Sequence, residues 1–144
     1  MEKPYCRILE GGVSVDDRGT VSFCNSLDFK TIKRFYMVEN FSTDTVRGMH
    51  GHMKEEKFVL AVSGAALFVV CPLTEAKVLA RDFEKIVVRG SSILWLSAGL
   101  AHGFRCLVPD TRLMFFSTAT LEESKADDFR FPVYNRDLWK AMDR

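Results

Sequence analysis

Short apolar and β-branched runs alternate along the chain with polar turn signals such as Asp16-Asp17-Arg18-Gly19, Ser63-Gly64 and Pro109-Asp110. The pattern predicts strands at residues 20–24, 32–38, 46–52, 57–62, 66–71, 86–88, 93–96, 103–108 and 113–117. Strands of this length and spacing favour a sandwich or a closed β-barrel over alternating β–α units.

The C-terminal part of the chain has a different pattern. Residues 121–129 are acidic and polar and follow Thr120, whose hydroxyl can cap a helix, so a short helix is expected there. The tail from Phe131 onward is rich in large apolar side chains, and we expect it to fold back on the barrel or onto a second subunit. With no linker or repeat, residues 1–144 are predicted to form a single domain.

The charge and composition of the chain argue against nucleic acid and membranes as binding partners. The formal net charge is +1 with both signs mixed along the chain, so neither nucleic acid nor an anionic membrane surface is an expected partner. No apolar run approaches the roughly 20 residues of a membrane span. The four cysteines are scattered without a Cys-x-x-Cys pair, which favours free thiols and a cytoplasmic location.

Two segments carry the chemistry. One reads Arg47-Gly48-Met49-His50-Gly51-His52 and is followed closely by Lys57, and the other places His102 in Gly99-Leu100-Ala101-His102-Gly103-Phe104. His50 and His52 share one face of a strand because side chains alternate. We expect all three histidines of the chain to converge on one pocket of the barrel.

These segments resemble the two-part motif of the cupins, and most closely the dTDP-4-dehydrorhamnose 3,5-epimerases. That family's D-x-R-G, N-x-S, R-G-L-H, K-L-V and P-x-G-F-A-H-G-F elements are similar to residues 16–19, 40–42, 47–50, 57–59 and 97–104. The resemblance implies an all-β cupin fold, a double-stranded β-helix or jelly-roll barrel with a short C-terminal helix or tail. Residues 32–36 and the paired histidines also resemble the sugar 3,4-ketoisomerases, which are cupins too.

The chemistry of a nucleotide-linked 4-keto-6-deoxy sugar suits these residues. The ketone acidifies the hydrogens on C3 and C5, so epimerisation needs a base, a donor near O4 and a proton source across the ring. His50 is the candidate base because imidazole titrates near neutral pH. The resemblance assigns Lys57 to the ketone oxygen, and His102 is expected to assist there or to orient His50.

The proton donor departs from the family pattern. Thr120 stands where the epimerases carry a tyrosine, and a threonine hydroxyl is far too weak an acid to replace it. Tyr36 is therefore the candidate donor, with Tyr134 a poorer one. The family's late aspartate partner for its histidine has no clear match in the sequence.

The remaining candidates concern binding. Arg18 and Arg47 are expected to hold the pyrophosphate, since guanidinium groups match phosphate oxygens. Asn40, Ser42 and His52 are further candidates for substrate binding, although Asn40 and Ser42 suit a turn between strands equally well.

The expected function is epimerisation at C3, C5 or both, without metal or other cofactor, by an isomerase that the resemblance implies is a homodimer. The product would serve bacterial surface polysaccharide, such as the O-antigen of lipopolysaccharide. Three alternatives stay open. They are a 3,4-ketoisomerase, a metal cupin using His50, His52, Glu56 and His102, and a sugar-binding cupin without catalytic activity.

Overall fold

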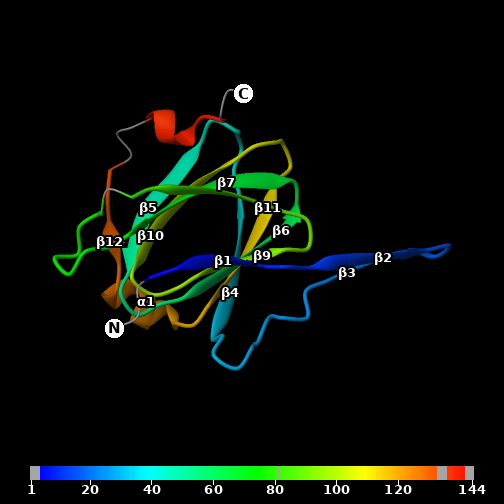
Figure 1. The fold of residues 1–144 in the computed structure, drawn as a ribbon, viewed down its shortest axis with the longest axis horizontal. Coiled ribbons are helices and arrows are strands. Elements are labelled where there is room, and N and C mark those ends of the chain that lie inside the picture. Colours follow the sequence, from blue (N-terminus) through cyan, green and yellow to red (C-terminus); the bar gives the residue numbers. More distant parts are fainter. Residues whose placement is uncertain (1–3, 81, 133–135, 142–144) are drawn as a thin grey trace.

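The computed structural model describes residues 4–80, 82–132 and 136–141, and most of it is β-strand (Figure 1). One five-stranded sheet, here the β6 sheet, has the order β1 (Cys6–Leu9), β9 (Ile93–Leu96), β6 (Lys57–Ser63), β11 (Arg112–Ser117), β4 (Arg34–Glu39). The other, here the β5 sheet, has the order β12 (Phe129–Arg130), β5 (Val46–His52), β10 (Leu100–Cys106), β7 (Ala65–Pro72), β8 (Glu84–Arg89). All pairings are antiparallel, and the predicted jelly-roll barrel is confirmed.

The barrel interior is filled by side chains of both sheets. Alternate apolar residues of the strands point inward and form one buried cluster, which includes Val59, Phe68, Val70, Leu94, Phe104, Leu113 and Phe115. Period-two alternation of this kind is what the sequence pattern predicts for strands with one buried face.

The C-terminal tail covers the outer face of the β5 sheet. Met49, Val69, Cys71 and Ala101 lie on that face and pack against Phe129, Phe131, Leu138 and Trp139. Trp139, in the short 3-10 helix Arg136–Trp139, is 4% exposed. For the described residues, the tail therefore folds back on its own barrel, one of the two outcomes expected from its composition.

The predicted helix is shorter than expected. It forms as α1 (Leu121–Ala126), with Thr120 as N-cap in a reciprocal capping box with Glu123. It ends at Asp127, and Phe129 and Arg130 instead pair with β5 as the strand β12. No helix in the described ranges is long and apolar enough to cross a membrane.

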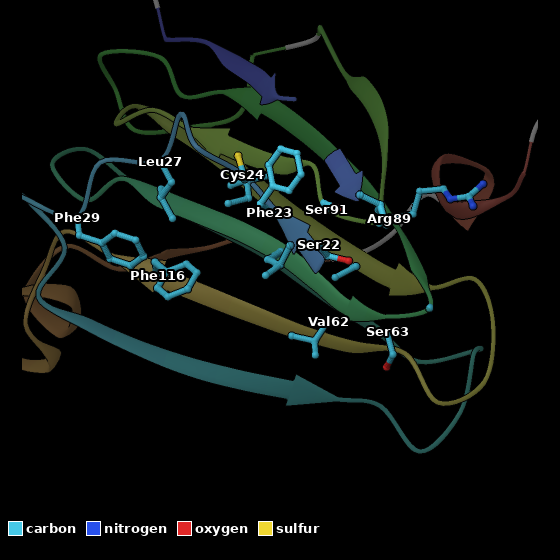
Figure 2. Close-up of a pocket in the computed structure, with 16 residues that line it drawn as sticks. Ser22, Phe23, Cys24, Leu27, Phe29, Val62, Ser63, Arg89, Ser91 and Phe116 are labelled. Atoms are coloured by element: carbon cyan, nitrogen blue, oxygen red, sulfur yellow. The ribbon is translucent and has the colours of Figure 1, made fainter. Parts of the chain in front are cut away.

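Strands β2 (Gly12–Asp16) and β3 (Gly19–Phe23) form a hairpin that projects away from the barrel (Figure 1). Strands β1 and β2 were not predicted from the sequence. Cys6 and Ile8 of β1 pack against the core, whereas Val13 and Val15 of β2 are both largely exposed. A cleft of about 600 Å³ lies where this arm meets the outside of β6 and β11. Figure 2 shows Phe23 and Leu27 on one side of it and Val62 on the other, with Phe29 beside Phe116.

Candidate active site

The three histidines lie near one end of the inner face of the β5 sheet. His102 of β10 pairs directly opposite His50 of β5, so their side chains share a face, and His52 follows on the same face. The His52 and His102 ring centroids are 6.3 Å apart. Beyond His102, this face continues with Phe68 and Phe104 of the apolar core. The polar groups therefore line the barrel mouth, above an apolar floor.

Two glycines bring β5 and β10 close together beside these histidines. Gly48 has φ +130°, and a Cβ added there would lie 2.5 Å from the Cα of Gly103. The strand register shifts at this point, between His102 and Phe104. Side chains at either glycine would push the strands apart, so both positions help to set His50 against His102.

His50 is paired with a carboxylate. Its Nδ1 lies 3.5 Å from Oδ1 of Asp128, and the His50 side chain is 37% exposed, so it faces the mouth and is not sealed in the core. Burial lowers the pKa of His50, and Asp128 opposes that shift only in part. The imidazole is therefore neutral near pH 7, with Nδ1 directed at Asp128 and Nε2 left to meet a ligand.

Asp128 is itself held as an anion. Its Oδ2 accepts a hydrogen bond of 2.8 Å from Nε of Arg130. Burial raises the pKa of Asp128, but the Arg130 hydrogen bond and the neighbouring charges outweigh burial and leave it below its ordinary value. An ionised carboxylate can orient His50 and stabilise the imidazolium that forms when His50 takes a proton.

Lys57 projects into the same mouth from the β6 sheet and is only 8% exposed. Its Nζ lies 3.3 Å from Nε2 of His52. The Nδ1 of His52 is 2.7 Å from the carbonyl oxygen of Asp127, which can only accept, so His52 donates there and its Nε2 accepts from Lys57. His52 thus orients Lys57.

Besides burial, the charge of Lys57 lowers the pKa of all three histidines. Burial is the largest cause that lowers the pKa of His50, of His52 and of His102, and the charge of Lys57 contributes to each shift. The pKa of His102 falls well below its ordinary value, so this ring is neutral and acts as a hydrogen-bonding group, without a positive charge. The pKa of Lys57 is lowered by burial, which the carboxylate of Glu55 partly offsets.

Tyr36 lies on the wall that carries Lys57. Its ring stacks on Phe115 with a centroid distance of 4.9 Å, and the Lys57 Nζ is 5.7 Å from the Tyr36 ring centre. Burial first, and then the charge of Glu55, raise the pKa of Tyr36. The phenol therefore stays protonated at neutral pH, as a proton donor must.

The predicted binding residues divide into two places. Nε of Arg47 donates to Oδ1 of Asn40 at 2.6 Å, between the ends of β4 and β5. The hydroxyl of Ser42 accepts from the backbone N–H of Asp44 at 3.1 Å, so it closes the turn. Arg18 lies apart, at the tip of the projecting hairpin, where it is paired with Asp16 and 86% exposed (Figure 1).

The metal alternative draws no support from side-chain geometry. The Glu56 carboxylate accepts a hydrogen bond of 3.0 Å from the Trp95 indole, so it is engaged away from the three histidines. Within residues 4–80, 82–132 and 136–141, no three His, Cys, Asp or Glu side chains are grouped to hold one ion.

Comparison with known proteins identifies the family. The sequence profile described as dTDP-4-dehydrorhamnose 3,5-epimerase matches residues 5–132. The chain belongs to the dTDP-4-dehydrorhamnose 3,5-epimerase family. This membership confirms the resemblance read from the motifs and the prediction of an isomerase of the sugar-epimerase type. No protein of curated function matches the sequence.

Solved structures agree on the fold. The dTDP-4-dehydrorhamnose 3,5-epimerase of Bacillus anthracis, with TDP and PPi bound, is 20% identical, with a TM-score of 0.74 over 96% of this chain and 86% of that one. The 3,4-ketoisomerase of Helicobacter canadensis is also 20% identical, with a TM-score of 0.70 over 88% and 90%. A third neighbour, a mutant of a Thermoanaerobacterium thermosaccharolyticum 3,4-ketoisomerase in complex with TDP-4-keto-6-deoxyglucose, is 15% identical, with a TM-score of 0.72 over 88% and 87%.

The structure accounts for one departure from the epimerase family pattern. Thr120, at the position of the family's tyrosine, caps α1 through its hydroxyl, which accepts from the Glu123 N–H at 3.2 Å. It is exposed and supplies no acid to the mouth. Tyr134, the second substitute considered for that tyrosine, lies outside the described residues.

Two site residues were missed from the sequence. Asp128 stands where a late aspartate partner was sought and not found, and Glu55 lies buried under Lys57. Both follow from tertiary contacts. Asp128 reaches His50 only because the chain after α1 returns to pair with β5, and the strand β12 was not expected. A signal was present in the adjacent pair Asp127-Asp128 at the end of the predicted helix, where acidic side chains oppose the helix dipole.

Proposed function

We propose that the protein epimerises a nucleoside-diphospho-4-keto-6-deoxyhexose at C3, C5 or both, through an enolate and without a cofactor. One observation carries the proposal: the neutral imidazole of His50, paired with Asp128, lies on the inner face of one sheet and within the electrostatic reach of Lys57, which lies beside Tyr36 on the opposite sheet. A sugar ring held between the two sheets has a base on one face and a proton donor on the other. That arrangement is what inversion of a carbon requires.

In the proposed mechanism His50 acts first. Its Nε2 removes the proton from the carbon next to the ketone, while Asp128 stabilises the imidazolium that results. The C–H bonding electrons form the enolate double bond, and negative charge gathers on O4 beside the Lys57 ammonium. A preorganised donor of this kind is typically worth about 3–4 kcal/mol to the transition state.

Tyr36 completes the inversion. Its phenol returns a proton to the same carbon from the opposite face, the enolate collapses to the ketone, and Lys57 stabilises the tyrosinate until solvent reprotonates it. His50 then loses its proton to solvent, so the enzyme is restored with no net change of protons. His102 is the neutral hydrogen-bonding partner near O4.

The pyrophosphate is proposed to lie against Arg47 and Asn40, with Ser42 at the rim. Arg18 joins this set only if a second copy of the chain supplies it, because the hairpin of one copy leads away from its own barrel (Figure 1). The proposed homodimer is supported by exposed apolar residues on this arm and on β4, which soluble monomers rarely leave uncovered in a patch.

A cytoplasmic location and a role in bacterial surface polysaccharide, such as O-antigen, remain part of the proposal. The four cysteines are free thiols, which is consistent with a reducing compartment. Deletion of the gene in its host, followed by analysis of the polysaccharide sugars, tests this role. An unchanged sugar composition counts against it.

The deciding experiment is hydrogen exchange on dTDP-4-keto-6-deoxyglucose in deuterated water, followed by NMR at each carbon. The expected result is deuterium at C3, C5 or both, with inverted product, and its loss in His50→Ala. Lys125→Ala, on the exposed face of α1, is the matched control and should exchange like the wild type. Absence of exchange on this and other 4-keto nucleotide sugars would leave a sugar-binding cupin.

A second candidate, 3,4-ketoisomerisation, has a specific observation behind it. The chain matches a 3,4-ketoisomerase over 88% of its own length and 90% of that one, and Thr120 leaves it without the epimerase tyrosine. The same experiment separates the two reactions. Ketoisomerisation moves the carbonyl to C3 and leaves the label at C4, whereas epimerisation keeps the carbonyl at C4.

A further inference from the structure

A carboxylate without solvent contact lies directly behind the catalytic lysine. The side chain of Glu55, between β5 and β6, is 0% exposed. Taking a carboxylate out of water costs several kcal/mol unless charged and hydrogen-bonding partners surround it. A group of this kind in a binding site therefore points to a task that a neutral residue cannot perform.

Two hydroxyl groups fix the Glu55 carboxylate from behind. Ser117 of β11 donates to its Oε1 at 2.6 Å, and Ser124 of α1 donates to its Oε2 at 2.8 Å. Both distances are those of good hydrogen bonds, and the two donors come from different elements. They set the direction of the carboxylate toward the barrel mouth.

Basic groups gather on the other side of the carboxylate. His52 Nδ1 lies 3.2 Å from Oε2, Arg34 Nη2 lies 3.5 Å from Oε1, and Lys57 Nζ lies 3.8 Å from Oε1. At 3.8 Å the ammonium feels the full charge but is not tied up in a hydrogen bond to Glu55. Apart from the N–H group that it gives to Nε2 of His52, the ammonium can donate to a ligand in the barrel mouth.

We propose that Glu55 is a positioning residue, whose buried carboxylate keeps the Lys57 ammonium charged and directed at the enolate oxygen while it offsets the neighbouring charge of Arg34. This inference rests on the epimerase mechanism proposed above. Without the carboxylate, two cations would share a desolvated corner of the mouth, and the ammonium would lose its proton more readily. Glu55 lowers the barrier by acting through Lys57, without touching the sugar.

The direct readout is the titration of Lys57 itself. In protein labelled with ¹³C-lysine, the Cε signal of Lys57, assigned by its absence in Lys57→Met, is followed against pH without ligand. The charged and titratable groups that face Lys57 are Arg34 and Tyr36 of β4, His50 and His52 of β5, His102 of β10, Glu55, and Asp128 after α1. Glu55→Gln removes one charge from this set and keeps the side-chain shape.

The expected result is a shift of the Lys57 titration to lower pH in Glu55→Gln. The matched control is Glu56→Gln, the adjacent carboxylate, which is bound to Trp95 and should leave the titration where it is. With dTDP-4-keto-6-deoxyglucose, kcat of Glu55→Gln should fall about 10- to 100-fold, as expected when a charged group loses its partner, while KM changes little.

An unchanged Lys57 titration in folded Glu55→Gln overturns the inference. If that variant does not fold, Glu55→Asp decides: the carboxylate is drawn back by one methylene, so the titration should still move to lower pH, and no movement overturns the inference. A wild type that exchanges no nucleotide sugar counts against the proposed function alone. The lysine titration still decides the part played by Glu55.

Discussion

Two influences act in opposite senses on the imidazole of His50, the proposed base. Burial lowers the pKa of His50, and the carboxylate of Asp128 raises it, with burial the larger cause. A general base works in its neutral form. In the wild type, kcat/KM should therefore rise with pH through a limb that lies below the ordinary histidine pKa of 6.5.

Asp128→Asn separates these two influences. Removing the charge takes away what raises the pKa of His50, so the acid limb of kcat/KM should move to lower pH. At the same time the plateau should fall about tenfold or more, because the imidazolium formed on proton abstraction is less stabilised. The measurement is the pH profile of exchange on dTDP-4-keto-6-deoxyglucose. Asp17→Asn, at the exposed hairpin tip, serves as control, and a limb that moves to higher pH contradicts the pairing.

At the scale of elements, one carboxylate joins α1 to the loop that leads into β6. Asp127, the C-cap of α1, is buried and accepts three successive backbone N–H groups, from Met53 at 2.9 Å, Lys54 at 2.8 Å and Glu55 at 3.0 Å. Its carbonyl oxygen also holds His52. This contact is what fixes the loop carrying Glu55 beneath the mouth.

Asp127→Asn tests that connection. The amide nitrogen cannot accept, so the variant loses either one or two of the three backbone bonds and leaves buried N–H groups unpaired. We expect the free energy of unfolding to fall by about 2–4 kcal/mol, measured by urea denaturation. The control is Asp44→Asn in an exposed turn. A loss below the error of the measurement would mean that the loop does not depend on Asp127.

Contacts of this kind separate the features that the sequence predicts from those that it does not. Strands β5 and β9 were predicted to the residue, because the polar turn residues that flank a strand are a local signal. His50 and His52 were placed on one face because alternate side chains of a strand point the same way, and His102 and Lys57 were selected from the motifs that they share with the family. The end of α1 and the strand β12 were not predicted. Asp127 is held by His52, 75 positions away in sequence, and Phe129 pairs with Gly51 of β5, so neither feature has a local signal. Asp128 was missed with them.

At the scale of the whole molecule, a single copy of the chain leaves large apolar side chains exposed to solvent on the hairpin and on β4. On the hairpin, Val13, Val15 and Val21 are 55%, 71% and 65% exposed, and on β4 Phe35 is 64% exposed. A two-stranded hairpin is marginally stable on its own in water. A second copy laid against the outer face of the β6 sheet would cover these residues.

Phe35→Glu places a charge in this proposed interface. By sedimentation equilibrium, the wild type should have twice the mass of one chain at micromolar concentration, and Phe35→Glu should have the mass of one. Leu121→Glu, on α1 and 57% exposed, is the control and should stay dimeric. A monomeric wild type would remove the homodimer from the proposal.

The proposed dimer also determines whether Arg18 can contribute to binding. The hairpin that carries this arginine projects away from its own barrel, so we expect it to hold the pyrophosphate only across an interface (Figure 1). Arg18→Ala should then weaken dTDP binding about tenfold, the loss expected for one charge-assisted phosphate contact. Phe35→Glu should weaken dTDP binding by a similar factor. It leaves every residue of the barrel mouth intact, but it separates the two copies and so removes the partner's arginine.

Calorimetric titration with dTDP measures both variants. The control is Arg112→Ala, because Arg112 is paired with Glu39. If Arg18→Ala binds dTDP like the wild type, Arg47 and Asn40 hold the phosphates without it, and each barrel mouth is complete in a single chain.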